Sequence, residues 1–198
     1  HVAGKSGRTA DVFQPLDGSV FGKVALATKA ELREAVENAK AAQPAWAATN
    51  PQRRARVLMK FLELCARDND KMAELLAREH GKTIPDAKGD IQRGLEVVEF
   101  ALGIPHLLKG EFTDSAGTGI DVYSMRQPLG VVAGITPFNF PAMIPLWKIG
   151  PALSSGNAMI LKPSERVPST SLYLAQLLQE AGLPDGVLQV VNGDKTVV

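Results

Sequence analysis

The sequence lacks several features that mark particular classes of protein. One cysteine among 198 residues excludes a disulfide within the chain. The three histidines lie far apart and lack the spacing of metal ligands, so we expect no metal site. The 22 basic and 21 acidic residues give a formal net charge of +1, which provides no basic excess for binding nucleic acid. We therefore expect no nucleic-acid partner.

Long hydrophobic runs are scarce as well. The uncharged stretch that approaches the length of a membrane span, residues 127–147, contains four prolines, two glycines and Asn139. Such a segment makes a poor membrane-spanning helix, because prolines and an unpaired amide leave polar groups unsatisfied in lipid. The first residues mix charged and apolar side chains, which is not the pattern of a signal peptide. We expect no membrane partner.

The remaining composition is that of a globular protein, with 45% hydrophobic residues. Asp17-Gly18 between two hydrophobic runs predicts a hairpin. Up to about residue 105 the pattern is then mainly helical: Thr28 and Glu31 form a capping box, and Gly81 is a stop signal. The predicted helices begin at Thr28, Asn50, Asp68 and Pro85.

Cys65 is the one thiol that a nucleophilic mechanism could use. It lies in FLELCARD, on the apolar stripe of a predicted helix. A cysteine in that position is typical of a hydrophobic core and is not activated as a thiolate. The sequence therefore favours a structural thiol.

The last third of the chain, residues 131–198, alternates apolar runs with helical patterns. This β-α-β-α-β order predicts a parallel sheet with right-handed crossovers. The predicted strands are GVVAGIT, NAMILKP and GVLQVVNG. The predicted helices are PAMIPLWKIGPALSSG, with Pro141 in its first turn, and VPSTSLYLAQLLQEAGLP, which ends at Gly182.

The predicted fold class is therefore α/β, with a helical N-terminal segment followed by a parallel half-sheet. A half-exposed strand around Ile120, in GTGIDVYSMRQPLG, is expected between the two parts. A sheet of three strands leaves an edge open and a face uncovered. We expect the chain to be a truncated part of a larger fold.

Polar residues gather where the predicted parallel strands end, in ITPFN, LKPSER and VVNGD. Ligands of open α/β sheets bind at these carboxyl ends. Lys162 presents a positive charge, and Glu165 can accept hydrogen bonds from the two vicinal hydroxyls of a ribose. A surface ion pair between the two is the alternative. The glycine-rich nucleotide fingerprints G-x-G-x-x-G and G-x-x-x-x-G-K-[ST] are absent.

Asn139 is an isolated amide in the apolar stretch ITPFNFP. A buried amide must find hydrogen-bond partners or cost free energy. At a strand-to-helix turn, however, its NH2 group can face a cleft. The alternative is a turn-forming asparagine bonded to its own backbone.

The run from PLGVVAGITPFNFP through KPSER to VVNG resembles the NAD(P)-dependent aldehyde dehydrogenase superfamily. With GKTIPDAKGDIQRGLEVVEFA upstream, it more narrowly resembles the CoA-acylating methylmalonate-semialdehyde dehydrogenases. The resemblance covers essentially the whole chain. It implies an aldehyde-dehydrogenase-type Rossmann-like domain, NAD as cofactor and coenzyme A as acyl acceptor.

The resemblance implies a catalytic and a substrate-binding residue. Asn139 matches the family's oxyanion-hole asparagine, whose NH2 group would stabilise the negative oxygen formed on the aldehyde carbon. Arg93 matches a position that helps to hold the carboxylate of the semialdehyde, which suits a bidentate guanidinium. Pairing of Arg93 with Glu96 or Asp90 on the helix surface is the alternative.

The resemblance also implies a cofactor site. Thr136 and Phe138 match positions that line the NAD site. Lys162 and Glu165 match the residues that hold the adenosine ribose, and Arg166 lies beside them. Glu165 on the ribose would favour NAD over NADP, because a 2′-phosphate would meet a like charge.

Full members of the family continue well beyond Val198 and carry their nucleophilic cysteine in a catalytic domain. The resemblance therefore implies three parts: N-terminal strands and helices (1–114), an oligomerisation flap strand (115–130) and the first part of the dinucleotide-binding fold (131–198). The catalytic domain would be absent from this chain, which alone should be inactive.

The expected reaction is the NAD-dependent oxidation of methylmalonate or malonate semialdehyde to propionyl-CoA or acetyl-CoA, with release of CO2. A homodimer or homotetramer is expected, in a bacterial cytoplasm or a mitochondrial matrix. Two alternatives stay open. One is a non-acylating dehydrogenase of a substrate such as succinate semialdehyde, and the other is a nucleotide-binding fragment without catalysis.

Overall fold

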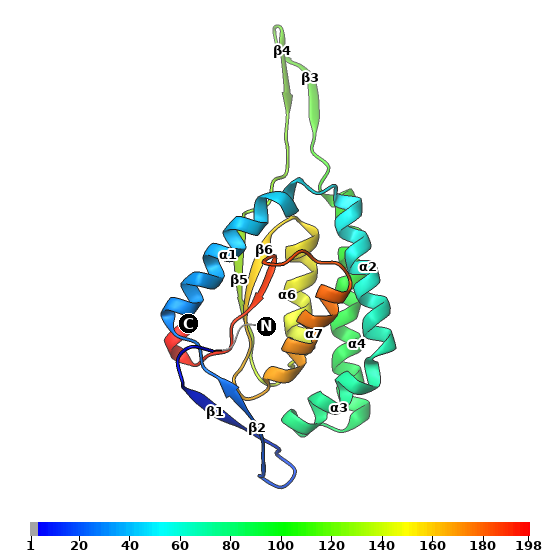
Figure 1. Ribbon diagram of the computed structural model, residues 1–198. Helices are drawn as coiled ribbons and strands as arrows, with labels where there is room; N and C mark the ends of the chain where they lie inside the picture. Colours follow the sequence, from blue (N-terminus) through cyan, green and yellow to red (C-terminus); the bar gives the residue numbers. More distant parts are fainter. Residues whose placement is uncertain (1–3) are drawn as a thin grey trace.

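The computed structural model describes residues 4–198, which form an α/β fold (Figure 1). Its strands are β1 (Thr9–Phe13), β2 (Val20–Ala25), β3 (Phe112–Gly117), β4 (Ile120–Tyr123), β5 (Val131–Ile135), β6 (Ala158–Lys162) and β7 (Leu188–Val190). Its helices are α1 (Lys29–Ala48), α2 (Pro51–Arg67), α3 (Asn69–His80), α4 (Ile84–Ala101), α5 (Ile104–Leu107), α6 (Met143–Ser154), α7 (Pro168–Glu180) and the 3-10 helix η1 (Lys195–Val197).

Three of the predicted signals that start or stop the N-terminal helices, at Thr28, Asn50 and Gly81, act as predicted. The Glu31 backbone N–H donates to Thr28 Oγ1 at 3.1 Å, and the Thr28 N–H donates to Glu31 Oε2 at 2.8 Å, which completes the capping box of α1. Asn50 accepts a hydrogen bond at the start of α2. Gly81 ends α3 with a φ of 83°, a conformation that suits glycine. These local causes explain why the predicted helices form.

The predicted parallel sheet is confirmed, with strand order β5-β6-β7. Alternate residues of the central strand β6 face opposite sides of the sheet. Ala158 and Ile160 pack against α1, whereas Met159 and Leu161 belong to the core beneath α6 and α7. Helix α1 therefore covers one face, and the crossover helices α6 and α7 cover the other (Figure 1).

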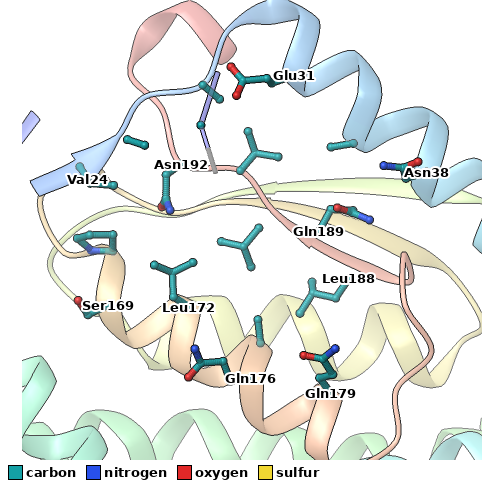
Figure 2. Close-up of a pocket in the computed structure, with 18 of the residues that line it drawn as sticks. Val24, Glu31, Asn38, Ser169, Leu172, Gln176, Gln179, Leu188, Gln189 and Asn192 are labelled. Atoms are coloured by element: carbon teal, nitrogen blue, oxygen red, sulfur yellow. The ribbon is translucent and has the colours of Figure 1, made fainter. Parts of the chain in front are cut away.

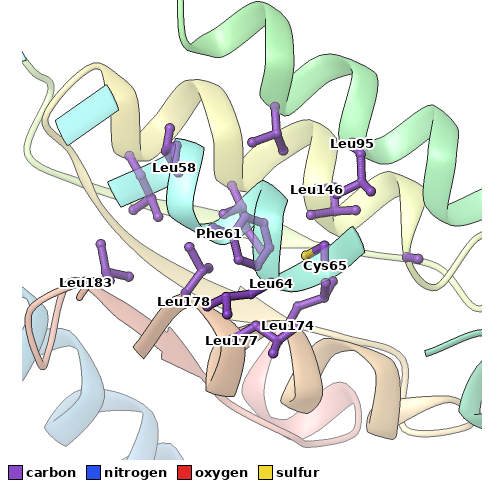
Figure 3. Close-up of a cluster of buried hydrophobic side chains, with 14 of the residues drawn as sticks. Leu58, Phe61, Leu64, Cys65, Leu95, Leu146, Leu174, Leu177, Leu178 and Leu183 are labelled. Carbon is purple, nitrogen blue, oxygen red and sulfur yellow. The ribbon is translucent and has the colours of Figure 1, made fainter. Parts of the chain in front are cut away.

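The main core lies between α6 and α7 on one side and α2 and α4 on the other. Figure 3 shows Phe61 and Cys65 of α2 among Leu146 of α6 and Leu174 of α7. Cys65 is fully buried, and burial, together with the negative charge of Asp68, raises the pKa of its thiol to about 12. At neutral pH the group stays protonated, so the prediction of a structural thiol agrees with its position.

Four expectations differ from the structure. Helix α6 begins at Met143, and Pro141 lies in the turn before it. Asp68 precedes α3 without capping it, because its carboxylate binds Arg67 and Tyr173. Strand β5 is only partly buried, since it pairs with β6 alone among the described strands. The strand around Ile120 is exposed at all four positions, because it pairs with the unpredicted β3 in a hairpin that projects from the body (Figure 1).

Candidate cofactor and oxyanion site

The segments that follow β5 and β6 meet at the carboxyl edge of the sheet. In the parallel register Ile135 lies opposite Lys162, and the N–H of Thr136 donates to the Lys162 carbonyl at 3.1 Å. Thr136 is buried, with 4% of its surface exposed. Two residues predicted from separate motifs therefore touch through the backbone, because carboxyl ends of parallel strands meet at one edge.

Lys162 and Glu165 form an ion pair at this edge. Lys162 Nζ lies 3.0 Å from Glu165 Oε2, and their side chains are 11% and 38% exposed. Burial opposes ionisation of Glu165, but hydrogen bonds from its own backbone and from Lys162, with the charges of Lys162 and Arg166, hold its pKa below the ordinary value. The edge thus presents an ionised carboxylate at neutral pH, fixed in place by a lysine.

Phe138 and Arg166 bridge the two turns above the sheet. The guanidinium carbon of Arg166 lies 5.1 Å from the centroid of the Phe138 ring, within cation–π range. Both residues are exposed. The turns after β5 and β6 therefore meet at one edge, where Phe138 and Arg166 face solvent, Glu165 is half-buried, and Thr136 and Lys162 are buried.

Asn139 lies in the turn between β5 and α6, and it is exposed. Within residues 4–198 its side chain makes no hydrogen bond. The turn therefore lacks the alternative arrangement, in which the amide binds its own backbone. The NH2 group is available to a molecule outside the described chain. Asn139 directly follows Phe138, one of the candidate cofactor residues, in this turn.

Arg93 is exposed on α4, in the part of the helix that runs beside α6. Its carbonyl accepts a hydrogen bond from Trp147 Nε1 at 3.2 Å, which ties this turn of α4 to α6. Within the described chain the Arg93 guanidinium makes no ion pair. The alternative partner Asp90 instead binds Lys82 at 2.6 Å, so Arg93 is free to meet an anion from solution.

Sequence reasoning missed two buried carboxylates that cap the crossover helices from a distance. Neither α6 nor α7 has a side-chain cap of its own. Asp90 Oδ1 accepts from the Met143 N–H at 2.8 Å, and Glu79 Oε2 accepts from the Ser169 N–H at 3.0 Å. Burial raises the pKa of Glu79, although the hydrogen bonds from Ser169 oppose the shift.

The sequence contained a signal for both buried carboxylates, Glu79 and Asp90. Glu79 follows Met72 and Leu76 at helical spacing, and Asp90 follows Ala87 in the same way, so each carboxylate interrupts an apolar stripe. A charged residue on a buried stripe needs a partner. The sequence alone did not say which partner.

A hollow in the surface lies elsewhere. It has a volume of about 740 Å³ and runs along the edge strand β7, between α1, α7 and the β1–β2 hairpin (Figure 2). Gln176, Gln179, Gln189 and Asn192 are among its polar lining residues (Figure 2). None of the seven residues expected to act in catalysis or binding lines it.

Two kinds of feature are missing from the described part of the chain. Residues 4–198 contain no group of three or more histidine, cysteine or acidic side chains placed to hold a metal ion. Among the same residues no helix is both long and apolar enough to span a bilayer.

Comparison with known proteins places the chain in a family. A family model described as "Aldehyde dehydrogenase family" matches residues 1–198. Malonate-semialdehyde dehydrogenase of Pseudomonas aeruginosa is 52% identical over 193 residues, which are 98% of this chain and 39% of that protein. The acylating mitochondrial methylmalonate-semialdehyde/malonate-semialdehyde dehydrogenase of Homo sapiens is 46% identical over 197 residues, 100% of this chain and 37% of that protein.

A solved structure agrees with these relatives. A crystal structure from Sinorhizobium meliloti 1021, complexed with NAD, superposes with a TM-score of 0.98 at 65% identity and covers 99% of this chain and 40% of that one. The chain thus spans well under half the length of the proteins that it matches. The family model over all of its residues, together with the parallel sheet and the polar turns at its carboxyl edge, shows that this chain belongs to the aldehyde dehydrogenase family.

Proposed function

We propose that the full-length protein is an NAD-dependent, CoA-acylating dehydrogenase of malonate and methylmalonate semialdehydes. This chain supplies part of its NAD-binding domain and is inactive by itself. The observation that carries the proposal is the exposed Asn139 amide, with no partner in the described chain, in the turn whose first residue, Thr136, is hydrogen-bonded to Lys162. The names of the relatives support the substrate class.

The proposed overall reaction balances without any further reactant. Malonate semialdehyde, CoA and NAD+ give acetyl-CoA, CO2 and NADH; the methyl-substituted substrate gives propionyl-CoA. A cysteine thiolate outside this chain attacks the aldehyde carbon. As that bond forms, the carbonyl oxygen becomes negative, and the Asn139 NH2 group donates a hydrogen bond to it. The same residue therefore binds the transition state more tightly than the aldehyde.

The residues at the carboxyl edge suit a dinucleotide. The ionised Glu165 is an acceptor for ribose hydroxyls, and Lys162 beside it presents donors and fixes its position. Thr136, Phe138 and Arg166 complete the surface. When bound, NAD would supply the hydride acceptor. Arg93, whose guanidinium is unpaired in the described chain, would hold the carboxylate of the semialdehyde.

Replacing Glu165 by glutamine should shift the choice of cofactor. The change keeps the size of the side chain and removes the charge that would repel a 2′-phosphate. We expect the ratio of kcat/KM for NADP to kcat/KM for NAD to rise about tenfold, because hydrogen bonds to charged groups contribute roughly 1.5–3 kcal/mol. Steady-state kinetics with both cofactors measures it. The control Glu37→Gln, on the exposed face of α1, should leave the ratio unchanged, and an unchanged ratio in Glu165→Gln would contradict the assignment.

An assay of the full-length protein tests the function. Malonate semialdehyde, NAD and CoA are supplied together, NADH is followed by absorbance, and acyl-CoA is identified by mass spectrometry. We expect acetyl-CoA in amounts equal to NADH. Free acid formed without CoA, with succinate semialdehyde as the better substrate, would establish the non-acylating alternative. Nucleotide binding without any NADH would establish the non-catalytic one.

We also propose that the β3–β4 hairpin joins two copies of the protein. A two-stranded hairpin by itself is marginally stable in water, and this one exposes Phe112, Ile120 and Tyr123 to solvent. A dimer or tetramer would cover these side chains. Light scattering checks this: the full-length protein with Ile120 and Tyr123 both changed to serine should have a lower mass than the parent.

We place the protein in the cytoplasm of a bacterium or in the matrix of a mitochondrion. The relatives support both settings, since they include proteins from Pseudomonas aeruginosa and from human mitochondria. Cell fractionation of the source organism, with detection of the full-length protein, distinguishes these compartments from a membrane fraction.

A further inference from the structure

The turn that carries Asn139 has little regular structure of its own. Residues 136–142 belong to no helix or strand, and the Asn139 side chain makes no hydrogen bond within the described chain. The position of its amide is therefore set by the contacts of the neighbouring residues. Two of those contacts come from Lys82, in the segment that joins α3 to α4, and from Asp90 of α4.

Lys82 contacts the residue directly after Asn139. Its Nζ lies 4.3 Å from the centroid of the Phe140 ring, a cation–π contact, and its side chain is only 14% exposed. The same ammonium lies 2.6 Å from Asp90 Oδ2. Lys82 is thus held between an aromatic ring of the turn and a carboxylate of α4.

Asp90 contacts the other end of the turn. Its side chain is 1% exposed, and Oδ1 accepts from the N–H of Met143, the first residue of α6, at 2.8 Å. Since α6 has no side-chain cap of its own, this bond satisfies one of the N–H groups that the helix start leaves without a partner. One buried carboxylate therefore connects Lys82, and through it Phe140, to the residue at which the turn ends.

The surroundings of this pair leave it little freedom. A Cβ added to Gly94, one turn after Asp90, would lie 2.5 Å from Leu146 Cδ1 and 3.0 Å from Met143 Cα, so α4 and α6 are in close contact here. Burial, aided by the charge of Lys82, lowers the pKa of His80, and an interaction with the backbone of Asn139 opposes that shift. Lys82 thus contacts the turn at Phe140, and Asp90 contacts the first residue after the turn, Met143.

We propose that Lys82 and Asp90 are positioning residues that hold the Asn139 amide in place for the oxyanion. The inference rests on the function proposed above for Asn139 and goes beyond it, because neither residue touches the reacting atoms. A preorganised donor works only if its support is fixed, and a misplacement of about 1 Å can lower a rate roughly 10²-fold.

The test uses the full-length enzyme with Asp90→Asn and Lys82→Met/Asp90→Asn. The asparagine keeps the shape and the acceptor for the Met143 N–H, and the double variant leaves no unpaired buried charge. We expect kcat to fall about 10- to 100-fold in the double variant, while the KM for NAD stays within about twofold. Lys82→Arg, which keeps the charge and the cation–π contact, should retain most of the activity.

A double-mutant cycle with Asn139→Ala separates positioning from general damage. If the pair acts through Asn139, removing the amide from the Lys82→Met/Asp90→Asn enzyme should lower kcat at least tenfold less than removing it from the parent. A loss of folded enzyme would lower the apparent kcat with and without the Asn139 amide by the same factor. The fold-change caused by Asn139→Ala would then stay unchanged. The cycle therefore measures the coupling between the Lys82–Asp90 pair and Asn139, whatever fraction of the variant folds.

A matched control comes from an exposed ion pair that joins α3 to α4. Lys88 Nζ lies 2.6 Å from Asp70 Oδ1, but the side chains are 43% and 83% exposed. Lys88→Met should leave kcat within about twofold of the parent. Full additivity in the cycle, or an unchanged kcat in the double variant, overturns the positioning role while Asn139→Ala still impairs the parent enzyme. If Asn139→Ala has no effect on the parent, the proposed function of Asn139 fails first.

Discussion

Replacing Asn139 by alanine in the full-length enzyme should lower kcat by roughly 10²–10³-fold. Loss of one preorganised donor from an oxyanion hole has an effect of that size, because the donor acts on charge that develops in the transition state. The aldehyde itself is bound mainly by other groups, so its KM should change much less than kcat. Steady-state kinetics with malonate semialdehyde, NAD and CoA measures both constants.

The stability of the Asn139→Ala enzyme should match that of the parent. The side chain is exposed and makes no hydrogen bond within the described residues, so its removal breaks no contact. Asn38, an exposed asparagine of α1, offers a matched control, and Asn38→Ala should leave kcat within about twofold. A kcat for Asn139→Ala equal to that of the control would remove Asn139 from the reaction.

Replacing Phe61 by alanine should produce the largest loss of stability in this part of the protein. Phe61 has no exposed surface and lies in the cluster between α2, α6 and α7 (Figure 3). Truncation of a buried phenylalanine removes its transfer free energy and leaves a cavity, at a cost of about 3–5 kcal/mol. Because α6 begins where the Asn139 turn ends, the loss should also reduce the fraction of active enzyme.

Hydrogen exchange of the α2 amides in the full-length protein measures this effect. The opening free energy should fall by about 3–5 kcal/mol in Phe61→Ala. Met59, two residues earlier on the same helix, is 51% exposed, and Met59→Ala should lower it by less than about 1 kcal/mol. Equal values for the two variants would mean that Phe61 is not part of the packed core.

The candidate site was predictable to the extent that it depends on strand order. Short apolar runs alternating with helical patterns predict a parallel sheet, and a parallel sheet brings the turns after β5 and β6 to one edge. Thr136 and Lys162 accordingly meet there. The ion pair of Lys162 with Glu165 is also local, because the two residues are three positions apart. The roles of these residues came from the resemblance to a family and remain proposals.

What the sequence determined by itself is local. The capping box of Thr28 and Glu31 and the left-handed glycine at residue 81 act on their own neighbours, so their effect can be read from adjacent letters. Strand β3 was not predicted from the sequence, because FTDSAG shows no sustained alternation of apolar and polar residues. It also contains Ser115 with a φ of 51°. Its partner β4 and the turn between them make it a strand.

Only the tertiary structure decided which distant groups satisfy the crossover helices. Asp90 reaches Met143 over 53 positions, and Glu79 reaches Ser169 over 90 positions. The apolar stripes of α3 and α4 indicate that these carboxylates are buried, but a buried carboxylate has many potential hydrogen-bond donors. The choice among them depends on how α4 packs against α6 and how α3 packs against α7, and that packing is a property of the assembled core.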